Sequence, residues 1–299
     1  MKLLVRILIV FLVVNFLFMC NRTGKSETET ILKGSATVVV DETLLPILED
    51  EKMVFESTYD AKINLKPRSE AEAIQALLKD SAQIVVLARN LNSEELKFFS
   101  SAQRYPKVTP FAKDAIALIG NLNRKDSTIA LSEVLDFMKG KSSSSFKGLV
   151  FDNPNSGTVQ YMNNLAGIKN APEKGIYSFK TNAEVLKYVA ENPDMIGIIG
   201  INWIVQPSPE VQSYLKNIQV LDVQGVGKQG FYAPSQNNLA EGTYPLARQL
   251  YFVNVQGYDG LGMGFASFIA GERGQRIILQ SGLLPEHMPS RKIVTRKTL

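Results

Sequence analysis

The apolar positions in the first third of the chain alternate between two spacings. Short, nearly continuous apolar runs are typical of strands buried in a sheet, whereas apolar residues three and four apart are typical of helices with one buried face. This pattern predicts strands at 36–40, 61–65 and 83–88 and helices at 44–55 and 70–79. The order strand, helix, strand, helix, strand predicts a doubly wound α/β layer.

The second part of the chain repeats this kind of alternation. We expect strands at 114–120, 149–151, 196–201 and 250–255, and helices at 133–139, after 155–158, around 185–189 and at 264–280. Thr181 and Glu184 form a capping box for the third of these helices, and Ser132 is expected to cap the first. In the first unit, 66–69 is expected to be a turn whose Ser69 caps the helix that follows.

The first nineteen residues have the pattern of an export signal. Lys2 and Arg6 precede the apolar stretch 7–19, which is too short to span a membrane and fits the core of a signal peptide. The stretch ends at Cys20, the only cysteine, which predicts a bacterial lipoprotein with Cys20 as the lipid acceptor. Residues 20–32 would then be a tether, and the chain would lie in the cell envelope, on the periplasmic side and anchored to a membrane. An uncleaved anchor, or an ordinary secretory signal with an incidental cysteine, is the alternative.

Composition narrows the possible chemistry. Hydrophobic residues make up 45% of the chain and charged residues 21%, which is a globular balance and excludes a disordered chain. A single cysteine excludes an internal disulfide, and a single histidine, His287, excludes a zinc site built on several histidines. The net charge of +4 is too small and too dispersed for a nucleic-acid binder. We therefore expect no metal, no cofactor and no nucleic-acid partner.

At four places in the predicted α/β layers, which we call corners, polar residues follow the carboxyl end of a strand. Open α/β sheets bind ligands at such positions. Residues 155–158 are the most informative, because two hydroxyls and free backbone N–H groups at a helix start form an anion site. Arg68 and Arg89 can add guanidinium groups that suit a tetrahedral oxyanion. Asp41 and Glu42 are adjacent, so we expect their side chains to point apart, with one of them capping a helix. Outside these corners, His287 is expected on the surface, and Trp203 is expected to pack in the core or between lobes.

Six segments carry patterns that occur together in one known family. They are 110–117 (PFAKDAIA), 137–141 (FMKGK), 155–158 (NSGT), 185–203, 244–252 (YPLARQLYF) and 265–285. In this order they resemble the PstS-type phosphate-binding periplasmic proteins of the type II solute-binding fold, over about 33–285. The resemblance implies a two-lobed α/β fold in which each lobe is a mixed sheet flanked by helices. Lobe I would comprise 33–112 and 252–299, and lobe II 113–251.

The resemblance also implies a ligand shell from four loops. Carried over by position, this shell consists of Asp41, Glu42, Thr43, Arg68, Ser69, Ala88, Arg89, Ser156, Gly157 and Thr158. Three positions depart from the family pattern: two carboxylates stand where small hydroxyl residues are usual, Ala88-Arg89 lacks the usual aspartate, and Asp152-Asn153-Pro154 replaces the usual arginine. An alternative alignment places 34–37 (GSAT) on the first loop, but those residues begin the strand rather than follow it.

The resulting expectation is a monomeric binding protein rather than an enzyme. It would bind phosphate or a related small oxyanion between its lobes for import by an ABC permease, with no covalent chemistry. The alternative is an envelope sensor or scaffold lipoprotein with the same fold and a different ligand or none. An enzyme such as a phosphatase is the third hypothesis, and it lacks a convincing pair of nucleophile and base.

Overall fold

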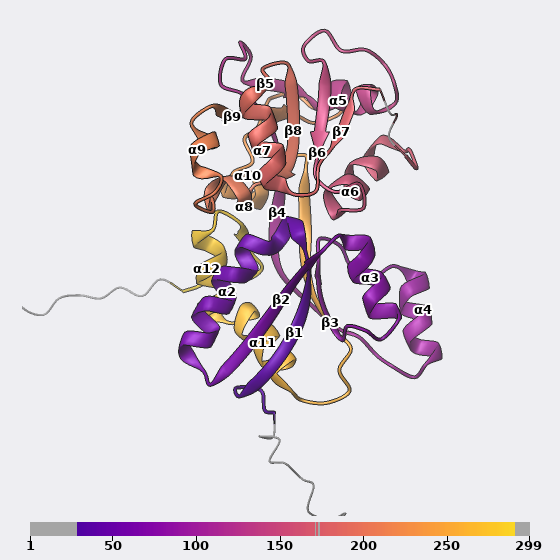
Figure 1. Ribbon diagram of the computed structural model, residues 1–299, viewed down its shortest axis with the longest axis vertical. Coiled ribbons are helices and arrows are strands. Elements are labelled where there is room, and N and C mark those ends of the chain that lie inside the picture. The colour runs from indigo at the N-terminus through magenta and orange to yellow at the C-terminus, as the bar shows by residue number, and fades with distance from the viewer. Residues whose placement is uncertain (1–28, 171, 173, 291–299) are drawn as a thin grey trace, which may run out of the picture.

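Two lobes are stacked along the long axis of the molecule in the computed structural model, which describes residues 29–170, 172 and 174–290 (Figure 1). Two long strands run between the lobes: β4 (Lys107–Asn121) and β11 (Ala247–Asn254). The first half of β4 pairs with β11 and its second half with β8 (Met195–Gly200), so β4 belongs to the sheets of both lobes. The predicted strand at 114–120 is therefore the distal half of a longer strand. Cys20 and the predicted signal peptide lie outside the described residues.

The lower lobe is a sheet covered by helices on both faces. Its strand order is β2-β1-β3-β11-β4, in which β1 (Gly34–Asp41) runs parallel to β2 (Ala61–Arg68) and β3 (Ile84–Leu87), while β11 is antiparallel to its neighbours. Successive side chains of a strand point to opposite faces. Val38 and Val40 accordingly pack with the residues of one apolar cluster, and Val39 packs with those of the other.

Each face of this sheet has its own helices. The face of Val38 carries α2 (Leu45–Thr58), α11 (Leu261–Ala270) and α12 (Glu272–Gln280), and the face of Val39 carries α3 (Glu70–Leu78) and α4 (Ser93–Ser101). Burying both faces explains why β1 and β3 are continuous apolar runs rather than alternating ones.

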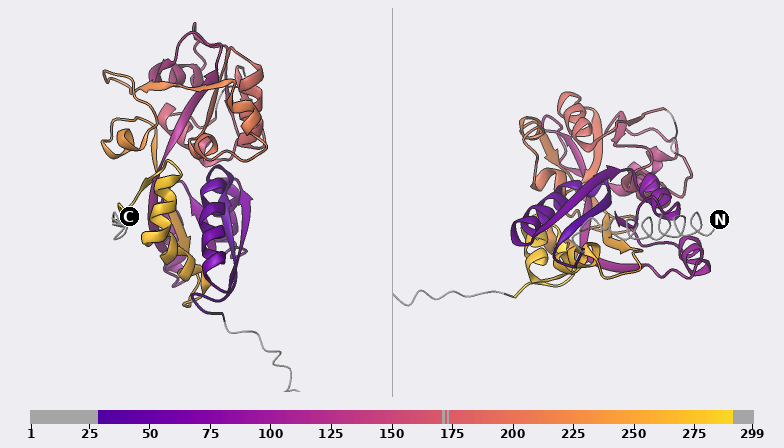
Figure 2. Two further views of the ribbon diagram at one scale, coloured as in Figure 1. Left: turned by 90° about the vertical axis from the view of Figure 1, so that its left-hand side faces the viewer. Right: turned by 60° about the horizontal axis from the view of Figure 1, so that its bottom comes forward.

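The upper lobe continues the sheet through β4-β8-β6-β7, with β6 at Gly148–Phe151 and β7 at Ile176–Ser178. Its main helices are α5 (Leu131–Met138), α6 (Gly157–Ala166) and α7 (Asn182–Glu191). The remaining elements are short: η1 (Glu42–Leu44), β5 (Thr128–Ala130), α8 (Asn202–Val205), α9 (Gln212–Leu215), β9 (Ile218–Val220), β10 (Asp222–Gln224), α10 (Gln236–Ala240) and β12 (Leu284–Pro285). Figure 2 shows the two lobes from the side, with the start of α2 in the lower lobe next to the upper lobe.

The capping predictions can be compared with the observed N-termini of the helices. Ser69 caps α3 and Thr181 caps α7, both in full capping boxes, as predicted. Ser132 does not cap α5: that helix begins one residue earlier, at Leu131, and Ala130 precedes it without a side-chain hydrogen bond. None of the helices in the described ranges is long and apolar enough to cross a membrane.

Two other local predictions were wrong. The expected long helix at 264–280 is two helices, because Gly271 has an extended backbone between them. Residues 66–68 continue β2 instead of turning, since β2 lies at the sheet edge, where a proline can be tolerated.

Candidate ligand site between the lobes

The N-terminus of α6 lies where the upper lobe faces the lower one. The chain leaves β6, forms a short loop and enters α6, and the Ser156 hydroxyl oxygen accepts the Val159 N–H at 3.3 Å. The Ser156 hydroxyl donates to an Asp152 oxygen at 2.5 Å. Gly157 and Thr158 occupy the first turn, where backbone N–H groups have no partner within the helix. This end of α6 therefore presents buried donors and a positive helix dipole toward the other lobe.

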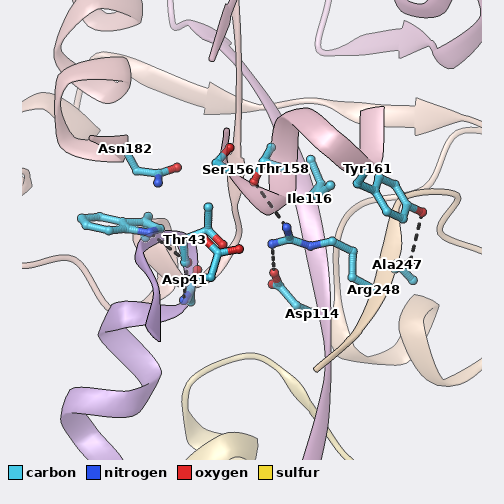
Figure 3. Close-up of polar contacts among 12 residues, drawn as sticks. Asp41, Thr43, Asp114, Ile116, Ser156, Thr158, Tyr161, Asn182, Ala247 and Arg248 are labelled. Carbon is cyan, nitrogen blue, oxygen red and sulfur yellow. Dashed lines mark hydrogen bonds and ion pairs between the residues drawn. The ribbon is translucent and has the colours of Figure 1, made fainter. Parts of the chain in front are cut away.

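A buried arginine lies beside this helix end. Arg248, on β11, pairs with Asp114 on β4 and donates from Nη1 to the Thr158 hydroxyl oxygen at 3.3 Å (Figure 3). All three side chains are buried. The ion pair therefore fixes a cation between the two connecting strands and the first turn of α6.

The end of β1 contributes three consecutive residues, Asp41, Glu42 and Thr43, which we call the β1 corner. An Asp41 oxygen accepts the Thr43 N–H at 3.2 Å, so Asp41 caps the short helix η1 as an aspartate can. The Thr43 carbonyl accepts Asn202 Nδ2 at 3.2 Å and Trp203 Nε1 at 3.1 Å, both from the upper lobe. The prediction that Trp203 packs in the core or between the lobes is confirmed.

Glu42 points a different way from Asp41, as predicted for adjacent residues. Its Oε2 accepts Asn182 Nδ2 at 2.7 Å, and the same amide nitrogen donates to Asp152 at 3.2 Å. Asn182 is fully buried and bridges a carboxylate of each lobe. The two lobes are thus held together by direct hydrogen bonds at the β1 corner.

The carboxyl groups of Asp41 and Glu70, both from the lower lobe, lie close to Gly157. A Cβ placed on Gly157 would lie 2.4 Å from Asp41 Oδ2 and 2.7 Å from Glu70 Oε2, so only glycine permits this approach. Both carboxylates are almost wholly buried, at 0% and 4% exposure. They lie against the first turn of α6, the position that a bound anion would take at such a helix end.

Burial raises the pKa values of the carboxyl groups in this region. The pKa of Asp41 rises to about 8, because burial disfavours its charge and Glu70 repels it, although Arg248 opposes the rise. The pKa of Glu42 rises to about 7, through burial and then Asp152. The pKa of Asp152 itself rises to about 6 through burial, against the hydrogen bond from Ser156. At neutral pH Asp41 therefore holds a proton that it can donate.

The other predicted site residues have different positions. Arg89 donates from Nε to Glu70 at 3.0 Å and from Nη1 and Nη2 to Glu95 at 2.9 and 2.8 Å. It lines the cavity beside α6 together with Ala88, but most of its N–H groups are used. Ser69 is buried and engaged in its cap. Arg68 is exposed, and its guanidinium donates to the Pro67 carbonyl.

Several buried polar atoms between the lobes have no hydrogen-bond partner. They are Asp41 Oδ2, Thr43 Oγ1, Asp114 Oδ1, Asn182 Oδ1, Asn202 Oδ1 and Arg248 Nε. Buried polar groups are ordinarily satisfied, so such a concentration marks a functional region. Within the described ranges, no group of histidine, cysteine, aspartate and glutamate residues could hold a metal ion.

The sequence located α6 and the β1 corner but missed the residues that join them. Glu70 follows a residue recognised only as a cap, and Asp152 was noted only as a departure from a family pattern. Arg248 and Asp114 lie 134 residues apart, and their pairing depends on the register of β4 with β11. The sequence signal available for this pair was Arg248, a charged residue in the predominantly apolar segment 244–252. His287 is exposed, as predicted.

Comparison with known proteins agrees with this architecture. Residues 24–273 match the model of a family described as the PBP superfamily domain. The chain is 23% identical over 282 residues to the phosphate-binding protein PstS of Pseudomonas aeruginosa, covering 85% of this chain and 84% of that one.

Two solved structures share the fold. One is a phosphate-bound putative phosphate ABC transporter substrate-binding protein from Clostridium perfringens. It has a TM-score of 0.69 and 20% identity, and the match covers 85% of this chain and all of that one. The other is an ABC-type phosphate transport receptor from Vibrio cholerae. Its TM-score is 0.63 and its identity 16%, with 84% of this chain and all of that one covered.

A mixed sheet in two lobes, with a polar site where they meet, defines a two-lobed α/β solute-binding fold. The chain belongs to the PBP superfamily domain family. Its resemblance to PstS-type phosphate-binding proteins, inferred from the six segments, is confirmed.

Proposed function

We propose that this chain is an extracytoplasmic solute-binding lipoprotein that binds phosphate or a related small oxyanion between its lobes for ABC-type import. The single observation that supports it best is the first turn of α6, which faces the other lobe with buried Thr158 beside Arg248. Helix N–H groups, a hydroxyl and a guanidinium are donors that bind tetrahedral oxyanions. The named activities of its relatives, phosphate binding and phosphate transport, are of the same kind.

The carboxyl groups at this site are compatible with a protonated oxyanion. Asp41, with a pKa of about 8, holds a proton at neutral pH and can donate it in a hydrogen bond. Glu70 can accept a hydrogen bond from an oxyanion that still carries a proton, as phosphate does and sulfate does not at neutral pH. The proposal therefore includes a preference for phosphate over sulfate.

The mechanism is binding followed by lobe closure, without covalent chemistry. Lobe I (33–112 and 252–299) and lobe II (113–251) would move about β4 and β11, and the bound anion would favour the closed arrangement by its differential affinity. The closed shape would be presented by a monomer to the permease subunits. Cys20 would carry the lipid that holds the protein at the periplasmic side of a membrane.

A calorimetric titration tests the proposal. The full-length chain is unfolded in guanidinium, dialysed and refolded in mild detergent to remove bound solute, and is then titrated with phosphate and with sulfate. We expect binding of phosphate and none of sulfate. Thr158→Ala should weaken phosphate binding by about 1.5–3 kcal/mol, the usual contribution of a hydrogen bond to a charged group. Thr58→Ala, at the exposed end of α2, is the matched control and should change nothing.

A second candidate function rests on the contacts of the β1 corner. Glu42 and Thr43 join the lobes directly, and Asp41 and Glu70 lie against α6 where an anion would bind. An envelope sensor or scaffold that closes without a small anion would have such contacts. Absence of heat with both ions would favour this second function.

A further inference from the structure

A cavity of about 520 Å³ opens beside the first turn of α6. Its walls come from the start of α3, the segment after β3 and one face of α6. A tetrahedral oxyanion has five heavy atoms, whereas cavities of this size hold organic ligands. The space therefore exceeds what inorganic phosphate needs.

Amide side chains dominate the polar lining of this cavity. Gln160 and Asn164 lie one turn apart on the same face of α6, and Asn90 and Asn92 face them from the loop after β3. The carbonyl oxygens of Asn90 and Asn92 accept backbone N–H groups of their own loop and of α4. These walls are neutral and polar, which suits the uncharged body of a small organic solute.

The inner end of the cavity is acidic. Glu70 and Gly157 both line it, and Glu70 is 4% exposed. Asp41 Oδ2, which is 2.4 Å from a Cβ built on Gly157, is fully buried and has no hydrogen-bond partner. Two carboxyl oxygens thus converge within 3 Å of one point beside Gly157. Of the residues that line this cavity, Arg89 is the only cation, and it is already bound to Glu70 and Glu95.

Monohydrogen phosphate can offer these carboxyl oxygens a single donor, whereas a primary ammonium group supplies three and a positive charge. We infer that the solute is a small organic oxyanion, a phosphate ester or phosphonate, that also carries a primary ammonium group. This inference rests on the proposed function and specifies the substrate class of that same site. The oxyanion would meet the first-turn N–H groups of α6, the ammonium would meet Glu70 with Asp41 behind it, and the carbon chain would lie between the amides.

Titration with four probes tests the inference on the refolded full-length chain. The probes are inorganic phosphate, ethyl phosphate, phosphoethanolamine and ethanolamine, which separate the oxyanion, the carbon chain and the amine. We expect phosphoethanolamine to bind at least tenfold more tightly than ethyl phosphate or inorganic phosphate. Equal affinities for ethyl phosphate and phosphoethanolamine would overturn the inference and leave the proposed function standing.

Two further outcomes concern the proposed function itself. No binding of any probe would overturn both proposals. Ethanolamine binding as tightly as phosphoethanolamine would show that the oxyanion contributes nothing, and would also overturn both.

A conservative variant assigns the amine preference to Glu70. Glu70→Gln keeps the shape and removes the charge, so the tenfold preference for phosphoethanolamine over ethyl phosphate should disappear while ethyl phosphate still binds. Glu94→Gln, on the exposed start of α4, is the control and should keep the preference. A preference that persists in Glu70→Gln would overturn the assignment of the ammonium to this carboxylate.

Discussion

The two sides of the contact between the lobes are built differently. At the β1 corner, Glu42 and Thr43 bond directly to Asn182, Asn202 and Trp203 of the other lobe. On the α3 side, the one backbone hydrogen bond between α3 and the loop before α6 joins the Ala71 N–H to the Asn155 carbonyl, and the surrounding side chains line an open cavity.

The cavities next to the two sides differ in the residues that line them. The cavity at the β1 corner has about 580 Å³ and is lined by Glu42, Glu49, Asp50 and Glu210 among prolines. The cavity on the α3 side has about 520 Å³ and is lined mainly by amides, with Glu70 and Arg89 at its inner end. Substitutions at the β1 corner should therefore act on stability and lobe closure. Substitutions of the exposed amides on the α3 side should change solute affinity without changing stability.

The largest effect is expected at the centre, where Arg248 serves both sides. Arg248→Met leaves Asp114 buried without its cation and should lower the free energy of unfolding by about 3–5 kcal/mol, measured by urea denaturation. Adding Asp114→Asn should restore part of the loss, because the double variant buries no charge. Arg276→Met, which breaks an exposed pair with Glu272, is the control and should change stability by less than about 1 kcal/mol. A similar small change for Arg248→Met would show that the buried pair does not organise the centre.

The next effect is expected at the amide bridge of the β1 corner. Asn182→Asp replaces the donor between Glu42 and Asp152 with a third carboxyl group and should destabilise the protein by about 1–3 kcal/mol at pH 8. The loss should shrink at pH 5, where these carboxyl groups hold protons. Asn237→Asp, at an exposed position, serves as the control in the same denaturation series. Equal losses at both pH values would mean that the bridge does not depend on charge.

The raised pKa of Asp41 makes the stability of this contact depend on pH. Its pKa of about 8 in the folded chain lies above its ordinary value of 3.8, so the folded protein keeps a proton that the unfolded chain releases. Stability therefore falls as pH rises from about 4 to about 8 and levels off above that. Asp41→Asn keeps the oxygen that accepts the Thr43 N–H and cannot ionise, so it should raise Tm at pH 8 by several °C. At pH 5 the difference in Tm should be smaller, because the fall in the stability of the wild type has only begun.

The raised pKa of Glu51 does not affect the comparison between wild type and Asp41→Asn. Burial raises its pKa to about 9, and it acts in the same direction in wild type and variant. The difference between the two melting curves therefore reports Asp41. An equal difference at both pH values would contradict the assignment.

The smallest effect on stability is expected on the α3 side. Gln160→Ala removes an exposed amide without a hydrogen bond to the protein and should change the free energy of unfolding by less than about 0.5 kcal/mol. Any loss should appear in solute affinity by calorimetry. A large loss of stability would mean that this wall belongs to the structural contact after all.

Prediction from the sequence succeeded where the determinants are local. The capping boxes of Ser69 and Thr181 and the buried strands at β1, β3 and β8 are set by neighbouring residues and were located within a few positions. The break at Gly271 was missed, because the apolar spacing continues across it and the extended backbone there depends on packing.

The candidate site was predicted only in its local parts. The β1 corner and the start of α6 were found because polar residues follow buried strands there. The approach of Glu70 to Gly157 was missed, because it joins two lobes across more than eighty positions and depends on how those lobes meet. Arg89 was expected to face the anion, yet its acidic partners Glu70 and Glu95 can be identified only once α3 and α4 are placed in space.

Oxyanion binding between the lobes, at the first turn of α6, can be observed directly. The most direct measurement is a crystal structure of the refolded chain grown with saturating phosphate. We expect tetrahedral density within hydrogen-bond distance of Thr158, with the Asp41 and Glu70 side chains rearranged around it. Phosphate bound elsewhere, or carboxylates still against Gly157 with no density beside them, would contradict it.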